Sequence, residues 1–427
     1  MKYNVFSLAA TLLLCNAVYS QTSLKSGPRA DTLSLEKSGK SVKNFSKVVG
    51  WKDGETPLAP AGFSVTKYSG GLENPRKMYV LPNGDVLVAE AATINSGIKK
   101  AGAVIVGAAK SENQHVSVKR ITLLRYTKGT GMADVKEIFL ENLEQPFGML
   151  LLDGWLYVAN TNSLIRYPYK TGQTKMTAKG EKILDLNGNG RHWTRNLLAS
   201  EDGKKIYIAV GSSSNIAEHG MDKEKMRANI LEINRDGSGL KVFASGLRNP
   251  VGMAWYPGTH TLWATVNERD ELGDNLVPDY FTKVKPGGFY GWPYSYWGQH
   301  VDTRVKDQKP ELVKKAVVPD LSLGNHVAPL GMAFYTKSTF PAKYHNGAFI
   351  AEHGSWNSSK LQGYKVVFVP FSNGEPGKPE DFLTGFIADP NGIEVHGRPV
   401  DVVQLADGSM LVSDDVTNII WRVTATK

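Results

Sequence analysis

The feature of the sequence that most constrains its fold is a unit that recurs along the chain. Each copy has a leading loop, usually with Pro, then a short apolar run, a turn, and a second apolar run that opens into a polar trailing loop. The copy that begins at Gly246 reads GLRNPVGMAW, turns at Pro257–His260 and continues with Leu262–Val266. Short apolar runs bounded by Gly, Pro and Asn are typical of antiparallel strands joined by tight turns.

Six copies of this unit are present. Their second runs begin 50 to 86 residues apart, at Val86, Leu156, Ile206, Leu262, Ala348 and Met410. Repeats of about 50 residues with several short strands each are typical of β-propellers, in which every repeat is one four-stranded blade. The sequence therefore predicts an all-β, six-bladed β-propeller over residues 55–427. Unrelated β-sandwich domains that share the same turn chemistry are the alternative.

The first 54 residues have a different character. Lys2, the apolar run Val5–Leu14 and the small residue Ser20 form the pattern of a secretory signal peptide over residues 1–20. We expect export to the periplasm or the exterior. Residues 21–54 are polar and rich in Ser and Lys, which predicts an extended or disordered N-terminal extension. No other apolar run approaches the roughly 20 residues that a membrane-spanning helix requires.

The cysteine count and the net charge narrow the classes of function. Cys15, the only cysteine, lies in the expected signal peptide, which excludes disulfides, thiolate metal sites and a cysteine nucleophile in the mature chain. The formal net charge of +9 favours anionic partners, such as a small polycarboxylate. Because the basic residues are scattered rather than clustered, we expect no binding of nucleic acid.

Propeller geometry predicts where a site lies. The second strand of a blade returns antiparallel to the first, so the leading and trailing loops lie on the same face. Polar residues in the leading loops are Arg76, Gln145, His192, Arg195, Arg248, Asn249, His326 and Arg398. Those in the trailing loops are Glu90, Asn160, Ser212–Asn215, Asn267–Asp270, Glu352, His353, Trp356, Asp414 and Asp415. A concave face lined by convergent polar loops is the expected binding site.

These residue types favour particular chemistry, each with a structural alternative. His192 is suited to general-base catalysis near neutral pH, or else it hydrogen-bonds a neighbouring loop. The arginines are suited to carboxylate recognition, or else they form ion pairs between loops. Carboxylates such as Glu268 and Asp270 are suited to a hard cation such as calcium, or else they lie on a solvated loop.

Three segments carry a resemblance to a known family. GLRNPVGMAW, GGFYGWP and GRPVDVVQLADGSMLVSDD are similar to the soluble glucose/sorbosone dehydrogenase family, and the similarity runs from about Gly62 to Val423. The resemblance implies a six-bladed propeller that holds pyrroloquinoline quinone (PQQ) and calcium. It implies oxidation of a sugar at its anomeric carbon, or of a sugar aldehyde, with electrons passed to an external acceptor.

The resemblance also implies roles for individual residues. His192 corresponds to the catalytic base. The residues implied for quinone binding are Gln145, Arg195, Asn215, Arg248, Lys360 and Arg398. Calcium is implied at backbone carbonyls near Glu268, Arg269 and Asp270. Two departures are visible: the third-blade loop retains only Asn215 of an Arg-Asn pair, and Arg269-Asp270 replaces a Gly-Pro step in the fourth blade.

Two other functions remain open from the sequence. One is a metal-dependent hydrolase of the lactonase type, with Glu90, Asn160, Asn267 and Glu352 as ligands on the axis. The other is a non-catalytic propeller that binds glycan or protein through the aromatic segment Phe289–Trp297.

Overall fold

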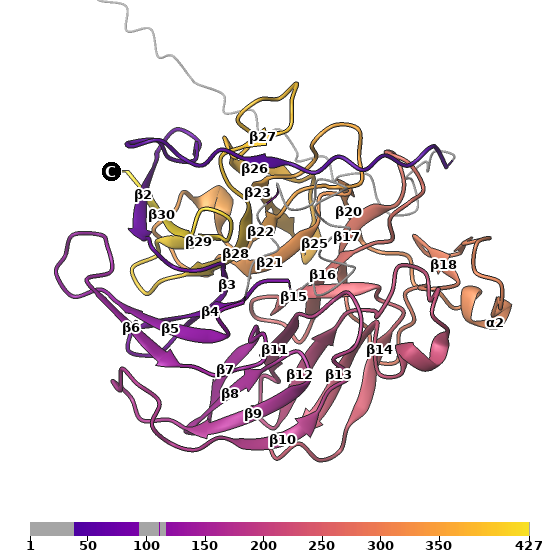
Figure 1. Ribbon diagram of the computed structural model, residues 1–427, viewed down its shortest axis with the longest axis horizontal. Helices are drawn as coiled ribbons and strands as arrows, with labels where there is room; N and C mark the ends of the chain where they lie inside the picture. Colours follow the sequence, from indigo (N-terminus) through magenta and orange to yellow (C-terminus); the bar gives the residue numbers. More distant parts are fainter. Residues whose placement is uncertain (1–37, 94–110, 112–116, 427) are drawn as a thin grey trace, which may run out of the picture.

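The computed structural model describes residues 38–93, 111 and 117–426. The expected signal peptide lies outside these residues. Six four-stranded antiparallel sheets surround a central axis, and Figure 1 looks along it. The predicted six-bladed propeller is therefore confirmed. Among the described residues no helix is long and apolar enough to span a membrane.

The blades follow one another in chain order, each from its innermost strand outward. Blade one consists of β3 (Pro75–Val80), β4 (Val86–Glu90), β5 (Arg120–Arg125) and β6 (Val135–Leu140). Blade two consists of β7 (Met149–Leu152), β8 (Trp155–Ala159), β9 (Ser163–Pro168) and β10 (Glu181–Asp185). Blade three consists of β11 (Arg195–Ala199), β12 (Lys205–Val210), β13 (Asn229–Asn234) and β14 (Lys241–Ser245). Blade four consists of β15 (Asn249–Trp255), β16 (Leu262–Asn267), β17 (Pro278–Lys283) and β20 (Leu321–Asn325). Blade five consists of β21 (Pro329–Phe334), β22 (Ala348–Glu352), β23 (Lys365–Val369) and β26 (Glu380–Leu383). The second strand of each blade starts within one residue of the start predicted from the repeat.

The sixth blade takes its strands from both ends of the propeller. β28 (Pro399–Gln404), β29 (Met410–Asp414) and β30 (Ile419–Ala425) supply three strands, and β2 (Phe63–Ser69) pairs antiparallel with β30 as the outermost one. The ring is thus closed by hydrogen bonds between segments far apart in the sequence. The repeat predicted the blade but not this closure.

Short elements decorate the blades. The two-stranded pairs are β1 (Lys47–Val48) with β27 (Glu394–Val395), β18 (Ser295–Tyr296) with β19 (His300–Val301), and β24 (Phe371–Ser372) with β25 (Glu375–Pro376). The helical turns are η2 (Met221–Glu224), α2 (Pro310–Val313) and η3 (Ala342–Tyr344).

A Pro-x-Gly-Met motif begins the innermost strand region of three blades and lets these strands approach one another at the axis. Its glycines are Gly148, Gly252 and Gly331. A Cβ atom at any of them would clash with the neighbouring blade: with the Arg195 carbonyl, the Leu330 carbonyl or the Asp401 side chain, respectively. Only glycine is compatible with this close approach of backbones.

Residues 38–54, which we call the N-terminal strap, are extended and attached to the propeller. Figure 1 shows the strap in indigo passing β27 and β26 on its way to β2. β1 pairs parallel with β27. Trp51 donates a 3.0 Å hydrogen bond from Nε1 to Asp414 and packs edge-on against Phe386 and Trp421. Residues 47–51 of the predicted extension are therefore packed against blades five and six.

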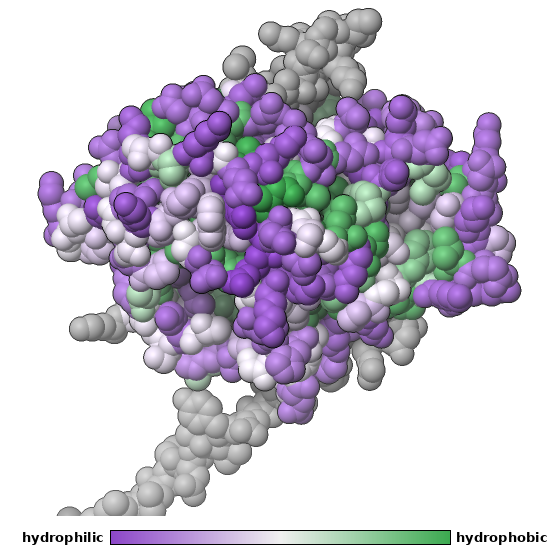
Figure 2. All heavy atoms as spheres, turned by 90° about the horizontal axis from the view of Figure 1, so that it is seen from below, coloured by the Kyte–Doolittle hydropathy of each residue, from purple (hydrophilic) through white to green (hydrophobic). Residues whose placement is uncertain are grey.

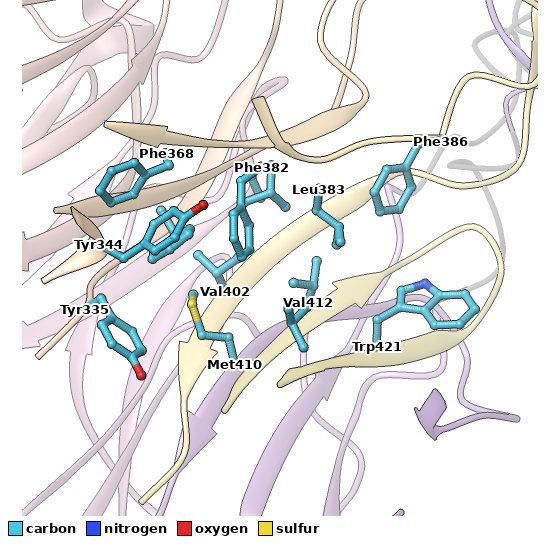
Figure 3. Packing of buried hydrophobic residues seen from close by; sticks show 14 of the residues in the cluster. Tyr335, Tyr344, Phe368, Phe382, Leu383, Phe386, Val402, Met410, Val412 and Trp421 are labelled. Carbon is cyan, nitrogen blue, oxygen red and sulfur yellow. The ribbon is translucent and has the colours of Figure 1, made fainter. Parts of the chain in front are cut away.

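The hydrophobic core lies between adjacent blades. Figure 3 shows the cluster between blades five and six, where Phe382 and Leu383 face Val402 and Val412. Alternate side chains of each strand point to the two neighbouring blades, so the strands are buried on both faces. The side of the molecule seen in Figure 2 is largely hydrophilic, with hydrophobic residues gathered in a central band.

Candidate functional site

A polar pocket of about 190 Å³ lies where the leading and trailing loops of blades three, four and five meet. Its lining residues are His192, Arg248, Asn249, Asn267, Glu268, Asp270, Asp279, His326, Ala328, Gly354, Trp356 and Asn357. Within the described residues, the loops of blades one, two and six contribute nothing to this lining. The pocket is therefore offset from the axis toward blades three to five.

His192 lies in the leading loop of blade three, and its geometry selects one tautomer. Its Nδ1 atom is 2.8 Å from the backbone oxygen of Ser212. A carbonyl oxygen only accepts, so Nδ1 carries the proton and Nε2 keeps a lone pair. Burial lowers the pKa of His192 well below 6.5, and the Arg248 charge lowers it further. The neutral imidazole therefore presents a basic nitrogen at neutral pH.

Two buried arginines fix the backbone around His192. Arg195, fully buried, donates to the carbonyls of Asn187, His192 and Thr194. Arg227 donates to those of Gly211, Asn187, Asn189, His192 and Ser212. Arg195 was predicted to bind the quinone, but its side chain is directed into this loop and does not line the pocket. It is placed to position the residue predicted as the base.

Arg248 is the guanidinium that lines the pocket. It donates to Asn215 Oδ1 at 2.9 Å, to the Glu268 carbonyl at 2.5 Å and to Asp270 Oδ2 at 3.1 Å. Asn215 in turn donates to the Asp270 carbonyl and accepts from the Asp270 amide. The predicted residues Asn215, Arg248 and Asp270 are thus brought together in one network, in which Asn215 holds Arg248 in place.

The carbonyls predicted to bind calcium already accept hydrogen bonds from cations. Arg248 donates to the carbonyl of Glu268, and Arg269 donates to that of Asp270 through Nε and Nη2. The guanidinium of Arg269 is buried and also paired with Asp302. Among the described residues, no group of three or more His, Cys, Asp or Glu side chains is arranged to hold a metal ion. This arrangement does not fit the calcium site that the resemblance implied.

Three carboxyl groups that line the pocket have shifted pKa values. Burial raises the pKa of Glu268 to about 7, and Oε1 of this side chain has no hydrogen-bond partner. Burial likewise raises the pKa of Asp279 to about 6, although it accepts from the amides of Glu268 and Ala328. Burial also opposes ionisation of Asp270, but Arg248, His326 and Arg191 together outweigh burial and lower the pKa of Asp270.

His326 is a buried imidazole that lines the pocket. Its Nε2 is 2.8 Å from the Gly273 carbonyl, and its Nδ1 is 3.8 Å from Asp270 Oδ1. Burial acts to lower its pKa, but Asp270 and the Gly273 carbonyl outweigh this and raise it. Arg248 and His326 therefore both lie beside Asp270, and Arg248 supplies the permanent positive charge of this group.

Besides Arg195 and Asn215, three more residues predicted to bind the quinone lie outside the pocket lining. Gln145, in the leading loop of blade two, donates to the Ala92 carbonyl. Arg398 is buried and donates to the carbonyls of His353 and Gly354. Lys360 is exposed on the trailing loop of blade five. Of these, Arg398 supports the pocket indirectly, since Gly354 is part of the lining.

The residues of the two alternative functions are also placed. Of the four metal ligands proposed for a hydrolase, Glu90 is bound by Arg120, Asn160 donates to Ser163 and Asn267 donates to the Pro329 carbonyl. Both Glu352 carboxyl oxygens are buried without a partner. In the aromatic segment Phe289–Trp297, Tyr290, Trp292 and Trp297 are buried, so their rings do not form an exposed glycan platform.

Some pocket residues were not singled out from the sequence. Asp279 is an acid in the buried strand β17, and Asn357 follows β22 beside Trp356. An acidic residue inside an otherwise apolar run was the available signal for Asp279. Aromatic residues in a polar leader, Phe45 and Trp51, were the signal that the strap packs against the propeller.

The sequence matches known proteins over nearly all of the propeller. The family model described as TrAA12-like matches residues 57–288 and 295–426. An uncharacterized protein of Borreliella burgdorferi is 30% identical over 299 residues, which cover 66% of this chain and 76% of that protein. A pyrroloquinoline quinone-dependent pyranose dehydrogenase of Coprinopsis cinerea is 25% identical over 424 residues, 85% of this chain. The match spans only 54% of the Coprinopsis protein.

Solved structures share the fold. The holo form of the PQQ domain of that Coprinopsis pyranose dehydrogenase superposes with a TM-score of 0.70 at 21% identity, covering 89% of this chain and 100% of the other. A calcium structure of the Trichoderma reesei Carbohydrate-Active Enzymes Family AA12 protein gives 0.70 at 19% identity, covering 87% and 97%. At these identities the structural likeness shows the fold alone.

Proposed function

The chain belongs to the TrAA12-like family, and we propose that it is a quinone-dependent dehydrogenase that oxidises a sugar or a sugar aldehyde. The observation that carries this proposal is His192: a neutral imidazole with its proton fixed on Nδ1, beside the guanidinium of Arg248 at the pocket. The PQQ-dependent name of the Coprinopsis relative supports the same assignment.

The pocket fits an anionic quinone in its donor chemistry. PQQ carries carboxylates, and the pocket is lined by the guanidinium of Arg248 and by the imidazole of His326. Guanidinium groups bind carboxylates with charge-assisted hydrogen bonds. Asn249, which also lines the pocket, has a buried Oδ1 atom without a partner. We infer that Arg248, Asn249 and His326 would hold the cofactor.

The protein's own part in the reaction is proton transfer. The quinone, when bound, supplies a two-electron acceptor for hydride from the sugar carbon. Nε2 of His192 accepts the proton of the hydroxyl on that carbon, so the C–H and O–H bonds break as a C=O bond forms. Ser212 stabilises the resulting imidazolium, because its carbonyl accepts from Nδ1–H. The electrons then pass to an external acceptor.

Calcium enters no step of this proposal. The name of the Trichoderma structure includes calcium, but the carbonyls of this chain that the family resemblance implied as ligands are hydrogen-bonded to Arg248 and Arg269. A cation at this position would first have to displace a guanidinium. We therefore propose that Arg248 provides the positive charge beside the cofactor.

The proposal includes an exported enzyme, in the periplasm or outside the cell, because of the signal-peptide pattern of residues 1–20. An exported dehydrogenase of this kind acts on a small sugar and transfers its electrons to a separate protein or dye.

The test is a titration of the purified protein with PQQ. Isothermal calorimetry and the absorbance of the cofactor monitor the binding. The loaded protein is then assayed by dye reduction with a panel of aldoses and aldehydes. We expect saturable binding and sugar-dependent reduction. Absence of binding at about micromolar PQQ, the range of ordinary cofactor affinities, would contradict the proposal.

A further inference from the structure

The beginning of the N-terminal strap contacts the wall of the pocket. The Gly39 amide donates to the Leu272 carbonyl at 2.8 Å, and the Asn44 amide donates to the Trp356 carbonyl at 2.8 Å. Asn44 Nδ2 also donates to the Ser359 carbonyl at 3.1 Å. The strap therefore bridges two loops: the one that follows β16 in blade four and the one that follows β22 in blade five.

Asn357 joins the strap to both loops. Its Oδ1 accepts from the Glu271 amide at 2.7 Å. Its Nδ2 donates to Ser41 Oγ at 2.7 Å and to the Val42 carbonyl at 2.8 Å. The side chain is 1% exposed, and it lines the pocket. One amide thus fixes the spacing of the strap, the blade-four loop and the blade-five loop.

Trp356 is the aromatic ring that lines the pocket. Phe45 of the strap stacks on it, with ring centroids 5.6 Å apart and planes inclined by 13°. Trp356 remains partly exposed, and among the described residues none hydrogen-bonds its indole N–H. A flat ring with an available N–H, next to polar groups, offers an apolar surface and a polar handle to a ligand.

The contacts of residues 39–45 are separate from the attachment of the strap to the propeller. β1 pairs with β27, and Trp51 packs against Phe386 and Trp421 at blades five and six. Residues 39–45, by contrast, hydrogen-bond and stack on the two loops that form the pocket wall. A change at Phe45 therefore acts on the wall while the attachment at β1 and Trp51 stays in place.

We propose that the N-terminal strap determines substrate specificity: Phe45 and Asn357 hold Trp356 as a platform for the ring of the sugar substrate. This inference rests on the proposed function and adds to it. Trp356 is the residue that contacts substrate, and Phe45 and Asn357 are positioning residues. The hydrogen-bonding groups Arg248 and His192, which also line the pocket, are left for the cofactor and the reacting hydroxyl.

The test compares Phe45→Ala and Trp356→Ala with the native protein and with the control Lys43→Ala, an exposed neighbour in the strap. Each PQQ-loaded protein is assayed with a cyclic aldose and with a short acyclic aldehyde. We expect KM for the aldose to rise roughly tenfold in both variants, the size of effect that loss of one apolar substrate contact has on specificity. The kcat values, the Kd for PQQ and the KM for the acyclic aldehyde stay within about twofold, since these do not depend on the ring platform.

Phe45→Tyr keeps the stacked ring and should restore the native KM for the aldose. Equal changes of KM for both substrates, a weaker Kd for PQQ in Phe45→Ala, or no change in KM for the aldose would overturn the role of the strap. An unchanged thermal melting temperature in Phe45→Ala and Trp356→Ala excludes unfolding as the cause. If the native protein itself fails to bind PQQ, the proposed function fails instead, and the two results are distinguishable.

Discussion

The Nδ1 atom of His192 lies 2.8 Å from the backbone oxygen of Ser212, which fixes the neutral tautomer of the imidazole. The Ser212 carbonyl in turn accepts from Arg227, so its position depends on a guanidinium that is buried behind the pocket. The proposed base is therefore oriented by backbone groups rather than by a carboxylate partner. Its basicity depends on burial and on neighbouring positive charge.

Replacing His192 removes the proposed base but leaves the cofactor-binding groups in place. We expect His192→Ala to lower kcat about 10²- to 10⁴-fold, the usual contribution of general-base catalysis, with little change in the Kd for PQQ. Dye reduction and calorimetry measure the two quantities. His219→Ala, at an exposed position in the same blade, is the matched control and should behave as the native protein. A His192→Ala variant with native kcat would exclude His192 as the base.

The pH dependence of the rate should follow the low pKa of His192. Only the neutral imidazole accepts a proton, and burial together with Arg248 favours this form. The acid limb of kcat/KM should therefore have its midpoint below 6.5. A profile measured from about pH 4.5 to 8.5 tests this. A midpoint at or above 6.5 would show that a different group, or a more solvated His192, controls the reaction.

Arg248 and Lys360 should differ in their effect on the cofactor. Arg248→Lys keeps the charge but loses the planar fork that binds carboxylates, so we expect the Kd for PQQ to rise about tenfold or more. Lys360→Ala changes an exposed residue outside the pocket lining and should leave the Kd within about twofold. Calorimetric titration measures both. A larger rise of the Kd in Lys360→Ala than in Arg248→Lys would mean that PQQ binds nearer the trailing loop of blade five.

Calcium should have little influence on cofactor affinity. The carbonyls of Glu268 and Asp270 accept from Arg248 and Arg269, which leaves them poor ligands for a cation. We expect equal Kd values for PQQ in excess chelator and in about millimolar calcium. A calcium-dependent decrease of the Kd would show that Arg248 releases the Glu268 carbonyl when the metal binds.

Glu352 should make stability depend on pH. Burial raises its pKa from 4.5 to about 8, so the native carboxyl keeps a proton that the unfolded chain releases between these values. Its contribution to stability is full below about pH 4.5 and is lost as the pH rises through 8. Thermal melts at about pH 5 and pH 9 should show a smaller fall in Tm for Glu352→Gln than for the native protein. Glu141→Gln, at an exposed position, is the control and should retain the native fall.

The sequence predicted what depends on local pattern. Turn residues and apolar runs predicted the strands of each blade, and the antiparallel return of the second strand predicted the face on which the pocket lies. The sequence did not predict the closure by β2, because the pairing of Val65 with Val423 is a contact between distant segments with no local signal. It also did not predict the strap, whose polar composition resembles that of a disordered leader.

Individual site residues were harder to predict because a position in a loop does not give the direction of a side chain. Arg195 and Arg248 occupy comparable leading loops, but Arg195 turns inward to backbone carbonyls while Arg248 lines the pocket. The deciding factor is which buried carbonyls need donors, and this depends on the folded loop. For the same reason Arg248 lines the pocket while Asn215 and Arg398 only support it. Gln145 and Lys360, which the resemblance also implied, lie elsewhere.

The pairing of β2 with β30 also sets an order of events during biosynthesis. β2 is the first blade strand to leave the ribosome, but its partner is among the last, 358 residues later between Val65 and Val423. Long-range pairing of this kind is slow, and an unpaired strand edge is prone to aggregation while it waits. A chain that stops before Ile419 leaves β2 unpaired and the ring open, however well its first five blades fold. Closure of the propeller is therefore a late step, because it requires that synthesis has passed β30.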